Sequence, residues 1–298
     1  METALILMST YNGEKFLKGQ IDSILNQKDV QCDILIRDDG SKDATTDLIR
    51  EAMKQYPQRL KLLEGDNEGY KRSFMNLVYK ASSDYDYYAF ADQDDIWLSN
   101  KVKMGIRSLT ESSHTPSLYY AMMTEVDENL NKLSNQQEFK PTPNYKEIIF
   151  QNFVQGSTII FNKALLKLVK SYKIKEEVPH DIILPILAKY CGQIIGDRNS
   201  YILYRKHASA VTVKMKNNYA KELLKEAFSD YKLTNYANIL LAGYKDYIKD
   251  KYIPYLKVVK NYRKLSNKIA LVNDSNVRKF SLKGTVMLKL AIIFNKLK

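Results

Sequence analysis

Blocks of apolar residues alternate with short polar stretches through roughly the first hundred positions of the chain. Four runs suit buried strands, at residues 4–8 (ALILM), 33–37 (DILIR), 60–63 (LKLL) and 87–91 (YYAFA). Between them, apolar residues recur at three- and four-residue spacing, which is typical of a helix with one buried face. Alternating strands and helices with short polar connections are the signature of a mostly parallel sheet. We therefore predict an α/β fold.

Polar and acidic residues follow three of these predicted strands. They are Thr10 and Tyr11 after the first strand, Asp38 and Asp39 after the second, and Asp92, Asp94 and Asp95 after the fourth. Ligands of parallel sheets bind beyond the carboxyl ends of the strands, and these ends meet at one edge. A single Asp-Asp-Gly-Ser sequence is often only a turn. Three clusters at the same edge nevertheless favour one shared site for a nucleotide and a metal ion.

The three carboxylates within residues 92–95 raise a question of charge compensation. They follow a run of aromatic and small apolar residues, and burying unpaired carboxylates is costly. A cation is the expected compensation. Divalent ions such as Mg²⁺ or Mn²⁺ take few protein carboxylates and complete their shell with phosphate oxygens and water, so one short acidic motif is sufficient. Asp95 has a second interpretation, as the cap of a helix that begins near Trp97.

The composition indicates a chain with a sizeable core. Its 298 residues are 45% hydrophobic. Cys32 and Cys191 lack CxxC spacing, which favours a reduced interior over a disulfide framework or a zinc site. The opening sequence METALILMST has no basic n-region, and no apolar run approaches the roughly 20 residues of a membrane-spanning helix. We expect a cytoplasmic protein, with a peripheral position at the inner face of the cell membrane as one alternative.

The net charge of +12 lies almost entirely in the C-terminal part of the chain. Residues 243–298 hold 14 Lys and Arg against three Asp and Glu. A helix is expected over residues 217–242. Beyond it, apolar residues are interleaved with lysines at Tyr252, Tyr255, Leu256, Val259 and Tyr262. Three alternatives stay open for this region: an anionic membrane surface, packing within the protein or a dimer, and nucleic acid.

Three motifs in the first hundred residues resemble a known enzyme family. STYNGEKFL, RDDGSKDAT and ADQDDIW occur in that order and spacing, as in the N-terminal half of glycosyltransferase family 2, and the bacterial rhamnosyltransferase-like branch is the most similar. The resemblance covers residues 4 to about 212. It implies the Rossmann-like GT-A fold, with a catalytic domain at 1–212. The charge and apolar spacing of the rest of the chain predict a basic helical region at 213–298.

The resemblance implies a binding site for a nucleotide-diphosphate sugar at the predicted sheet edge. In the family, an acid at the end of the second strand contacts the base, and that acid would be Asp39, with Asp38 beside it. Thr10 and Tyr11 would line the same pocket. A carboxylate can accept a hydrogen bond from the imide N–H of uracil or thymine, which makes UDP and TDP the expected nucleotides.

The family's DXD motif falls on Asp92-Gln93-Asp94. Asp94 would bind Mg²⁺ or Mn²⁺ directly, and Asp92 would lie nearer the ribose or a coordinated water. A Tyr-Arg-x-His element farther along supplies Arg205 and His207, two positions apart on an extended segment. By resemblance, Arg205 would neutralise the leaving diphosphate, and His207 would ligate the metal or a phosphate.

The resemblance places the catalytic base in the second half of the chain, at Asp181. By its pattern alone, Asp181 also fits the N-cap of the expected helix IILPILAKY. Many family members carry aromatic residues after this acid, whereas this chain has Ile182 and Ile183, which leaves the acceptor open. The turn at Gln155-Gly156-Ser157 resembles the acceptor side of the family's cleft.

These implications define an inverting, metal-dependent glycosyltransferase of cell-surface polysaccharide synthesis. Its expected acceptor is a glycan or a lipid-linked glycan, and rhamnose is the candidate sugar. The alternative is a non-catalytic basic protein that binds nucleic acid and uses the acidic motif as a structural metal loop. The DQDD run lacks the 12-residue ligand spacing of an EF-hand, which counts against a calcium loop of that kind.

Overall fold

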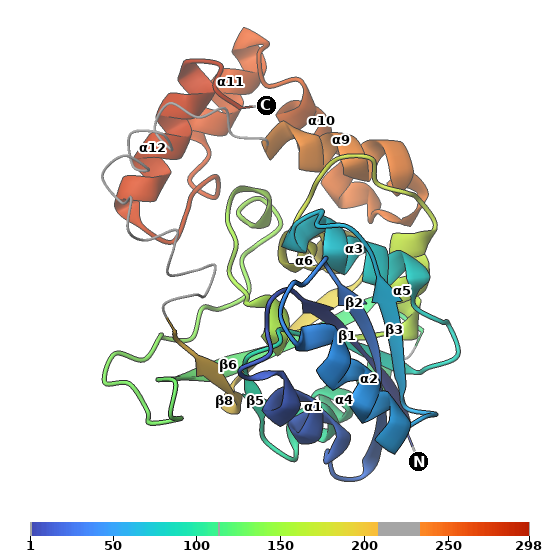
Figure 1. The fold of residues 1–298 in the computed structure, drawn as a ribbon. Helices are drawn as coiled ribbons and strands as arrows, with labels where there is room; N and C mark the ends of the chain where they lie inside the picture. Colours follow the sequence, from blue (N-terminus) through green and yellow to red (C-terminus); the bar gives the residue numbers. More distant parts are fainter. Residues whose placement is uncertain (1, 113, 208–232, 298) are drawn as a thin grey trace.

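The computed structural model describes residues 2–112, 114–207 and 233–297, and shows one curled sheet between layers of helices (Figure 1). The strands are β1 (Glu2–Thr10), β2 (Val30–Asp38), β3 (Leu60–Glu64), β4 (Tyr87–Ala91), β5 (Ile96–Trp97), β6 (Ser117–Val126), β7 (Ile160–Asn162) and β8 (Gln193–Arg205). They lie in the order β3-β2-β1-β4-β7-β6-β8-β5. The predicted α/β fold is confirmed.

The sheet is parallel through its first four strands and mixed beyond them. β1 pairs in parallel with β2 and β4, and β2 with β3. β7 then pairs antiparallel with both β4 and β6, while β6 and β8 are parallel and the short β5 is antiparallel to β8. The carboxyl ends of β1, β2 and β4 therefore meet at one edge, as the sequence predicts.

Helices cover both faces of the sheet because the central strands are apolar on both sides. In β1, Leu5 and Leu7 join one buried cluster, whereas Ile6 and Met8 join another on the opposite face. The helices of the first face are α3 (Tyr70–Lys80), α5 (Lys163–Lys170) and α6 (His180–Cys191), and those of the second are α1 (Leu17–Leu25), α2 (Thr45–Gln55) and α4 (Lys101–Leu109).

One predicted helix start is wrong. The sequence favoured a helix beginning near Trp97 with Asp95 as its cap, but Ile96–Trp97 form strand β5 against β8. The helix α4 begins only at Lys101, after Asn100. Asp95 instead points to the end of β8, where its Oδ1 accepts a hydrogen bond from the backbone N–H of Arg205 at 3.0 Å.

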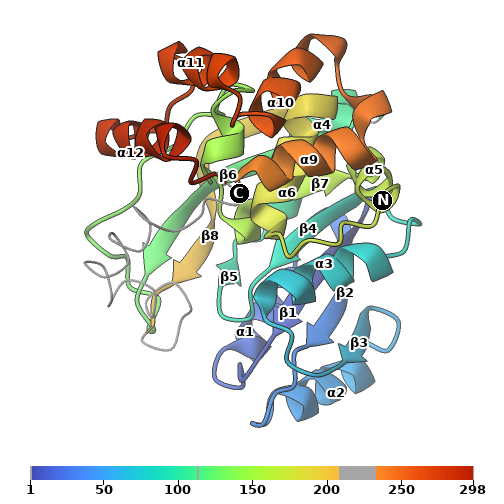
Figure 2. The ribbon, with the colours of Figure 1, turned by 90° about the horizontal axis from the view of Figure 1, so that it is seen from above.

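The C-terminal helices lie at one end of the molecule and share the buried cluster of the first face (Figures 1 and 2). They are α9 (Leu233–Gly243), α10 (Ile253–Lys260), α11 (Leu265–Asn273) and α12 (Leu282–Ile293). Leu240, Leu256 and Leu288 belong to the same buried cluster as Leu187 of α6. Most of the helix expected over 217–242, and the predicted domain boundary after residue 212, lie outside the described residues.

The apolar residues between the lysines of α10 face the protein interior. Tyr255, Leu256, Val259 and Tyr262 are all buried. Packing within the protein, one of the three alternatives for this region, therefore accounts for these residues. Among the helices that the structure describes, none combines the length and the apolar character needed to cross a bilayer.

We expect Leu256→Ala to lower the free energy of unfolding by about 2–5 kcal/mol, because it leaves a cavity where α10 meets the shared core. Denaturant unfolding followed by circular dichroism measures the change. Lys257→Ala, at the exposed next position, is the control and should stay within about 0.5 kcal/mol of the wild type. An unchanged unfolding midpoint for Leu256→Ala would show that α10 adds nothing to the stability of the fold.

Candidate active site

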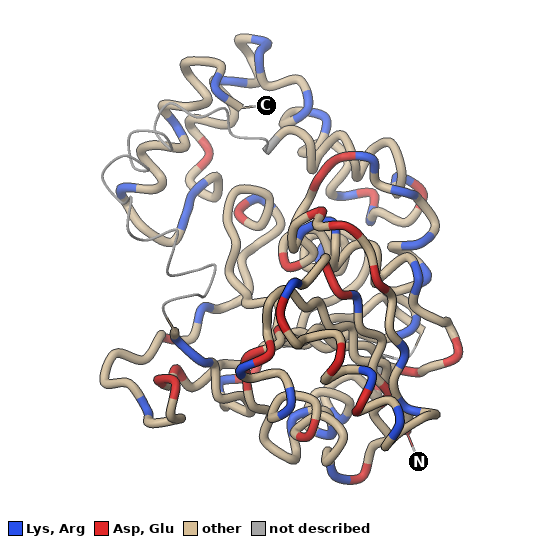
Figure 3. The backbone as a smooth tube through the Cα atoms, in the orientation of Figure 1, with Lys and Arg blue, Asp and Glu red and all other residues tan. Residues whose placement is uncertain are grey.

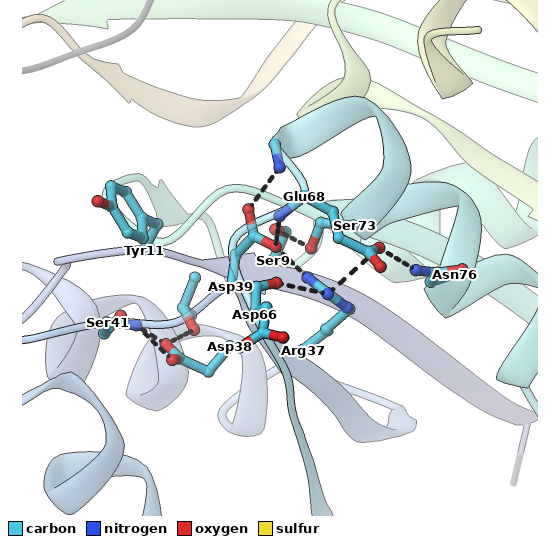
Figure 4. A network of polar contacts seen from close by, with 12 residues as sticks. Ser9, Tyr11, Arg37, Asp38, Asp39, Ser41, Asp66, Glu68, Ser73 and Asn76 are labelled. Atoms are coloured by element: carbon cyan, nitrogen blue, oxygen red, sulfur yellow. Dashed lines mark hydrogen bonds and ion pairs between the residues drawn. The ribbon is translucent and has the colours of Figure 1, made fainter. Parts of the chain in front are cut away.

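The turn after β2 is fixed to the end of β1 by the Asp38 carboxylate (Figure 4). Asp38 is 2% exposed and accepts hydrogen bonds from the backbone N–H and the hydroxyl of Ser41, at 2.8 and 2.6 Å. The hydroxyl of Thr10 donates to the same carboxylate at 2.8 Å. Thr10 and Asp38, both predicted at the donor pocket, are thus brought together by direct contact.

Asp39 organises the loop that precedes α3. It is 2% exposed and forms an ion pair with Arg37. Its two oxygens also accept the backbone N–H groups of Glu68 and Gly69, at 2.9 and 2.8 Å. Gly69 has a φ of 80°, a conformation that favours glycine. A carboxylate has about four acceptor positions, so these three contacts leave room for one hydrogen bond from a ligand.

Gln93 connects the end of β1 to the acidic loop. Its side-chain oxygen accepts the backbone N–H of Tyr11 at 2.8 Å, and its amide nitrogen donates to the Tyr11 carbonyl at 3.0 Å. The Tyr11 side chain itself is 45% exposed and is free to turn toward a ligand. Gln93 is the middle residue of the DXD motif, and the sequence contains no signal for this pairing.

The carboxylates of the acidic loop have different partners. Asp94 Oδ2 lies 2.7 Å from His207 Nε2, so two predicted metal ligands are adjacent. Asp95 is fully buried; burial, followed by the charges of Asp94 and Asp92, raises its pKa. Burial among protein atoms also raises the pKa of Asp92 to about 7, with further contributions from Asp94 and Asp181. In the metal-free protein, negative charge on Asp92 and Asp95 is therefore unfavourable.

Arg205 lies beneath the acidic loop and is 7% exposed. Its Nε donates to the Asp94 carbonyl at 2.8 Å, and its guanidinium also bonds to the carbonyl of Glu128. The aromatic ring of Phe16 stacks below it, 4.4 Å from Cζ. In this arrangement Arg205 attaches β8 to the acidic loop. Its implied contact with a diphosphate stays a prediction.

Asp181 lies within the first turn of α6, which begins at His180. It is therefore not the N-cap residue, a position that Pro179 takes. Its Oδ2 accepts a hydrogen bond from the amide of Asn152 at 2.8 Å, and burial raises its pKa. A raised pKa suits a carboxylate that must accept a proton.

The charge of Asp181 acts on residues from three other parts of the chain. It contributes to the raised pKa values of Asp92, Tyr70 and Tyr236, which follow β4, begin α3 and lie on α9. The candidate base is therefore close enough to the acidic loop to affect the pKa of Asp92, although the two are far apart in the sequence. Tyr70, Tyr236 and Asn152 were not predicted, because no local pattern marks them as neighbours of Asp181.

Residue 156 must be small because the ring of His180, the residue next to the candidate base, lies against it. A Cβ at Gly156 would lie 2.4 Å from Nε2 of His180. The His180 ring is buried between Phe74 and Phe90, at centroid distances of 4.0 and 4.3 Å, and burial lowers its pKa to about 3. A neutral imidazole is thus buried at the position before Asp181, and the glycine makes space for this ring.

A pocket of about 240 Å³ lies on the other side of Asn152. Aromatic side chains of Tyr120, Phe139 and Phe153 line it, together with the amides of Gln137 and Asn152. Because Asn152 also holds Asp181, the pocket opens beside the candidate base. Rings and amides in a small concave site are groups that suit a sugar.

The donor set near Asp94 fits a divalent cation that keeps much of its shell for other ligands. Within residues 2–112, 114–207 and 233–297, no three His, Cys, Asp or Glu side chains are grouped as a complete metal site. Asp94 and His207 are in place, with Asp92 nearby. Two or three protein ligands are compatible with Mg²⁺ or Mn²⁺ when phosphate oxygens and water supply the rest.

Comparisons with known proteins identify the class of enzyme and then its family. The chain is a glycosyltransferase: residues 5–169, more than half of its length, match "Glycosyl transferase family 2", and the chain belongs to that family. It is 30% identical over 252 residues to the dTDP-rhamnosyl transferase RfbG of Shigella flexneri, covering 78% of this chain and 84% of that protein. It is 24% identical over 230 residues to the β-1,3-glucosyltransferase WfaP of Escherichia coli, covering 76% and 85%.

Solved structures show the same fold. TarS residues 1–349 of S. aureus align over 100% of this chain and 81% of that one, with a TM-score of 0.58 at 17% identity. The mannosyltransferase PcManGT of Pyrobaculum calidifontis, solved with GDP-Man and Mn²⁺, aligns with a TM-score of 0.53 at 14% identity, over 99% and 81%. The predicted GT-A fold and family 2 resemblance are confirmed. The nucleic-acid-binding alternative gains no support.

We expect Asp92→Asn to raise the metal-free unfolding midpoint at pH 8. The folded-state pKa of about 7 exceeds the ordinary value of 3.8, so the stability that this carboxyl contributes is present below pH 4 and is lost as the pH rises through 7. At pH 8, removing the charge should raise the free energy of unfolding by about 2 kcal/mol and the unfolding midpoint by about 4 °C.

Thermal unfolding with EDTA, at pH 8 and at pH 5, measures this difference, which should shrink at pH 5. Glu51→Gln, on the exposed side of α2, is the matched control and should leave the midpoint unchanged. A lower midpoint for Asp92→Asn at pH 8 would mean that the Asp92 charge is already compensated.

Proposed function

We propose that the protein is an inverting, metal-dependent glycosyltransferase that uses a nucleotide-diphosphate sugar. The observation that carries this proposal is that Asp181 lies within electrostatic range of the acidic loop and is held by Asn152, which also lines a pocket. One side of the site can hold a diphosphate through Asp94 and His207. The other side can receive an acceptor hydroxyl beside a carboxylate of raised pKa.

The proposal of a nucleotide-diphosphate sugar as donor rests on the carboxylates of Asp38 and Asp39. Both carboxylates are locked in place by backbone and side-chain donors, so the pocket wall is preorganised for a planar base. Asp39 retains one acceptor position for an imide N–H. TDP or UDP fits this position, and the similarity to a dTDP-rhamnosyl transferase supports TDP-rhamnose as the first donor to test.

A divalent ion held by Asp94 and His207, with Asp92 beside it, would neutralise charge on the departing diphosphate. The structure supports this proposal through the pKa of Asp92, because a carboxyl raised to about 7 marks a place where positive charge is needed. The relative solved with Mn²⁺ is PcManGT, and Mg²⁺ and Mn²⁺ are both candidates here.

The chemical step follows from the position of Asp181. Its carboxylate accepts the proton of the acceptor hydroxyl while the hydroxyl oxygen bonds to the anomeric carbon. The bond from that carbon to the diphosphate oxygen breaks on the opposite face, so the configuration inverts. Asn152 holds the carboxylate in this orientation, and the neutral side chain of the preceding residue, His180, adds no competing positive charge.

We propose the 240 Å³ pocket as the acceptor site. Its aromatic residues can stack against a sugar ring, and Gln137 can hydrogen-bond sugar hydroxyls. A glycan or lipid-linked glycan of cell-surface polysaccharide synthesis is the acceptor class. We also propose that the protein acts in the cytoplasm.

Asp181→Asn should lower the rate of transfer by about 100- to 10,000-fold while donor binding persists, because the amide cannot accept the proton. Turnover and calorimetric binding of the donor measure the two effects separately. The control variant Glu177→Gln removes a half-exposed carboxylate that pairs with Lys71. This variant should transfer at the wild-type rate. Unchanged turnover in Asp181→Asn would refute the base assignment.

A thermal-shift panel of UDP, TDP, GDP and CMP with Mn²⁺ should show stabilisation by TDP or UDP. At about 100 times the dissociation constant, the expected gain is about 2.7 kcal/mol. EDTA, or the variant Asp94→Asn, should remove the metal-dependent part of the shift. If no nucleotide stabilises the protein in the presence of Mn²⁺, the donor proposal fails.

A further inference from the structure

The outer side of α11 and α12 is apolar and exposed. Eight of the 13 large hydrophobic residues that are exposed among the described residues lie within 265–294. They form what we call the α11–α12 face: Leu265, Ile269, Phe280, Leu282, Val286, Leu290, Ile293 and Phe294. Their exposed fractions run from 40% to 82%. Isolated surface hydrophobics need no explanation, whereas a concentration of this size marks an interaction site.

The spacing in α12 shows that this exposure is a continuous stripe. Leu282, Val286, Leu290 and Ile293 follow one another at intervals of four, four and three residues, which places them on one side of the helix. The opposite side, with Leu288, Ala291 and Ile292, is buried in the shared core. α12 therefore has two apolar sides, and only one of them is used within the described part of the protein.

The two helices present their stripes as one surface because they are tied together. Lys268 of α11 donates to the carbonyl of Ile293 at 3.1 Å, and Lys289 of α12 donates to the carbonyl of Val272 at 2.5 Å. Each lysine thus bonds to a carbonyl at or near the end of the other helix. Figures 1 and 2 both show α11 and α12 side by side at one end of the molecule.

The surroundings of this face are strongly basic. Residues 261–297 contain eight Lys and Arg and one acid, Asp274, which is already paired with Lys146. Figure 3 shows basic positions distributed along both helices and their connections. Two copies of this face would repel each other, whereas an anionic lipid surface offers both complementary charge and an apolar layer.

We propose that the α11–α12 face binds an anionic lipid surface. The exposed apolar stripe would enter the boundary between headgroups and acyl chains, and the surrounding lysines and arginines would contact the headgroups. The membrane-facing residues are then Leu282, Val286 and their neighbours, and not the buried Tyr255 of α10 or Tyr262 just after it.

The face is attached to the segment that leads to the proposed acceptor pocket. The backbone N–H of Phe280 donates to the side chain of Gln151 at 2.7 Å, and Arg278 pairs with Glu147 at 2.5 Å. Gln151 is the residue before Asn152, which holds Asp181. The link to a lipid-linked acceptor rests on the proposed function, whereas lipid binding by this face does not.

Sedimentation of the full-length protein with lipid vesicles tests the proposal. We expect binding to vesicles of equal parts phosphatidylglycerol and phosphatidylcholine, no binding to phosphatidylcholine alone, and weaker binding at high salt. The double variant Leu282→Glu/Val286→Glu should bind at least about tenfold more weakly. Lys264→Gln/Lys283→Gln, which keeps the stripe, should lose roughly fivefold for each charge removed.

The matched control is Leu98→Glu/Tyr247→Glu, which replaces two exposed hydrophobic residues outside the face and adds the same charge. It should bind like the wild type. Failure of the wild type to bind anionic vesicles, or equal losses in the control and in Leu282→Glu/Val286→Glu, would overturn the proposal. A wild-type dimer by light scattering that the stripe variant dissociates, without vesicle binding, would assign the face to a second copy instead.

The unfolding midpoint of each variant shows whether it is folded. If Leu282→Glu/Val286→Glu does not fold, vesicle binding by Lys264→Gln/Lys283→Gln still tests the proposal. Sedimentation needs no donor or acceptor. A protein that binds vesicles but transfers no sugar would therefore contradict the proposed function and leave this inference intact.

Discussion

The burial of closely spaced carboxylates is the constraint around which the candidate active site is arranged, because burial, followed by their mutual charge, raises the pKa values of Asp92 and Asp95. Asp95 accepts the backbone N–H of Arg205, yet burial and the charges of Asp94 and Asp92 still raise its pKa. Asp94 Oδ2 contacts His207 Nε2 at 2.7 Å. Asp92 also has a raised pKa, so a nearby positive charge would favour the ionised forms of both Asp92 and Asp95. Negative charge in the loop is therefore unfavourable at the place where the proposed donor diphosphate and its cation would bind.

The parts of the fold that sequence could predict are those governed by local pattern. The runs that begin at Ala4 and Tyr87 are continuously apolar, so the central strands were predictable from the local sequence pattern alone. The same holds for the acids that follow them, because turn residues mark the strand ends. Asp95 was misassigned because its partner, Arg205, is 110 positions away. Gln93 and Asn152 were missed for the same reason, since neither residue type nor spacing reveals a partner supplied by another strand or helix.

The basic C-terminal region shows a further limit of pattern analysis. Both α10 and α12 alternate apolar residues with lysines, yet Leu256 is buried in the shared core and Leu282 is 82% exposed. Helical periodicity identifies that a helix has an apolar side, but not what covers it. α12 is apolar on two sides, so one stripe is buried and the other is exposed. Only the packing of each helix, which buries Leu256 in the shared core and leaves Leu282 exposed, separates these two cases.

The attachment of the C-terminal helices to residues 144–152 connects the two halves of the function. Tyr255 donates to the carbonyl of Lys146 at 3.0 Å, and Glu147 and Gln151 bond to the connection between α11 and α12. The same segment ends at Asn152, whose amide holds the candidate base. Whatever fixes the orientation of α11 and α12 therefore also fixes the segment that ends at Asn152. If the acceptor is anchored in a lipid layer, as we propose, this coupling would set the direction from which the acceptor hydroxyl reaches Asp181.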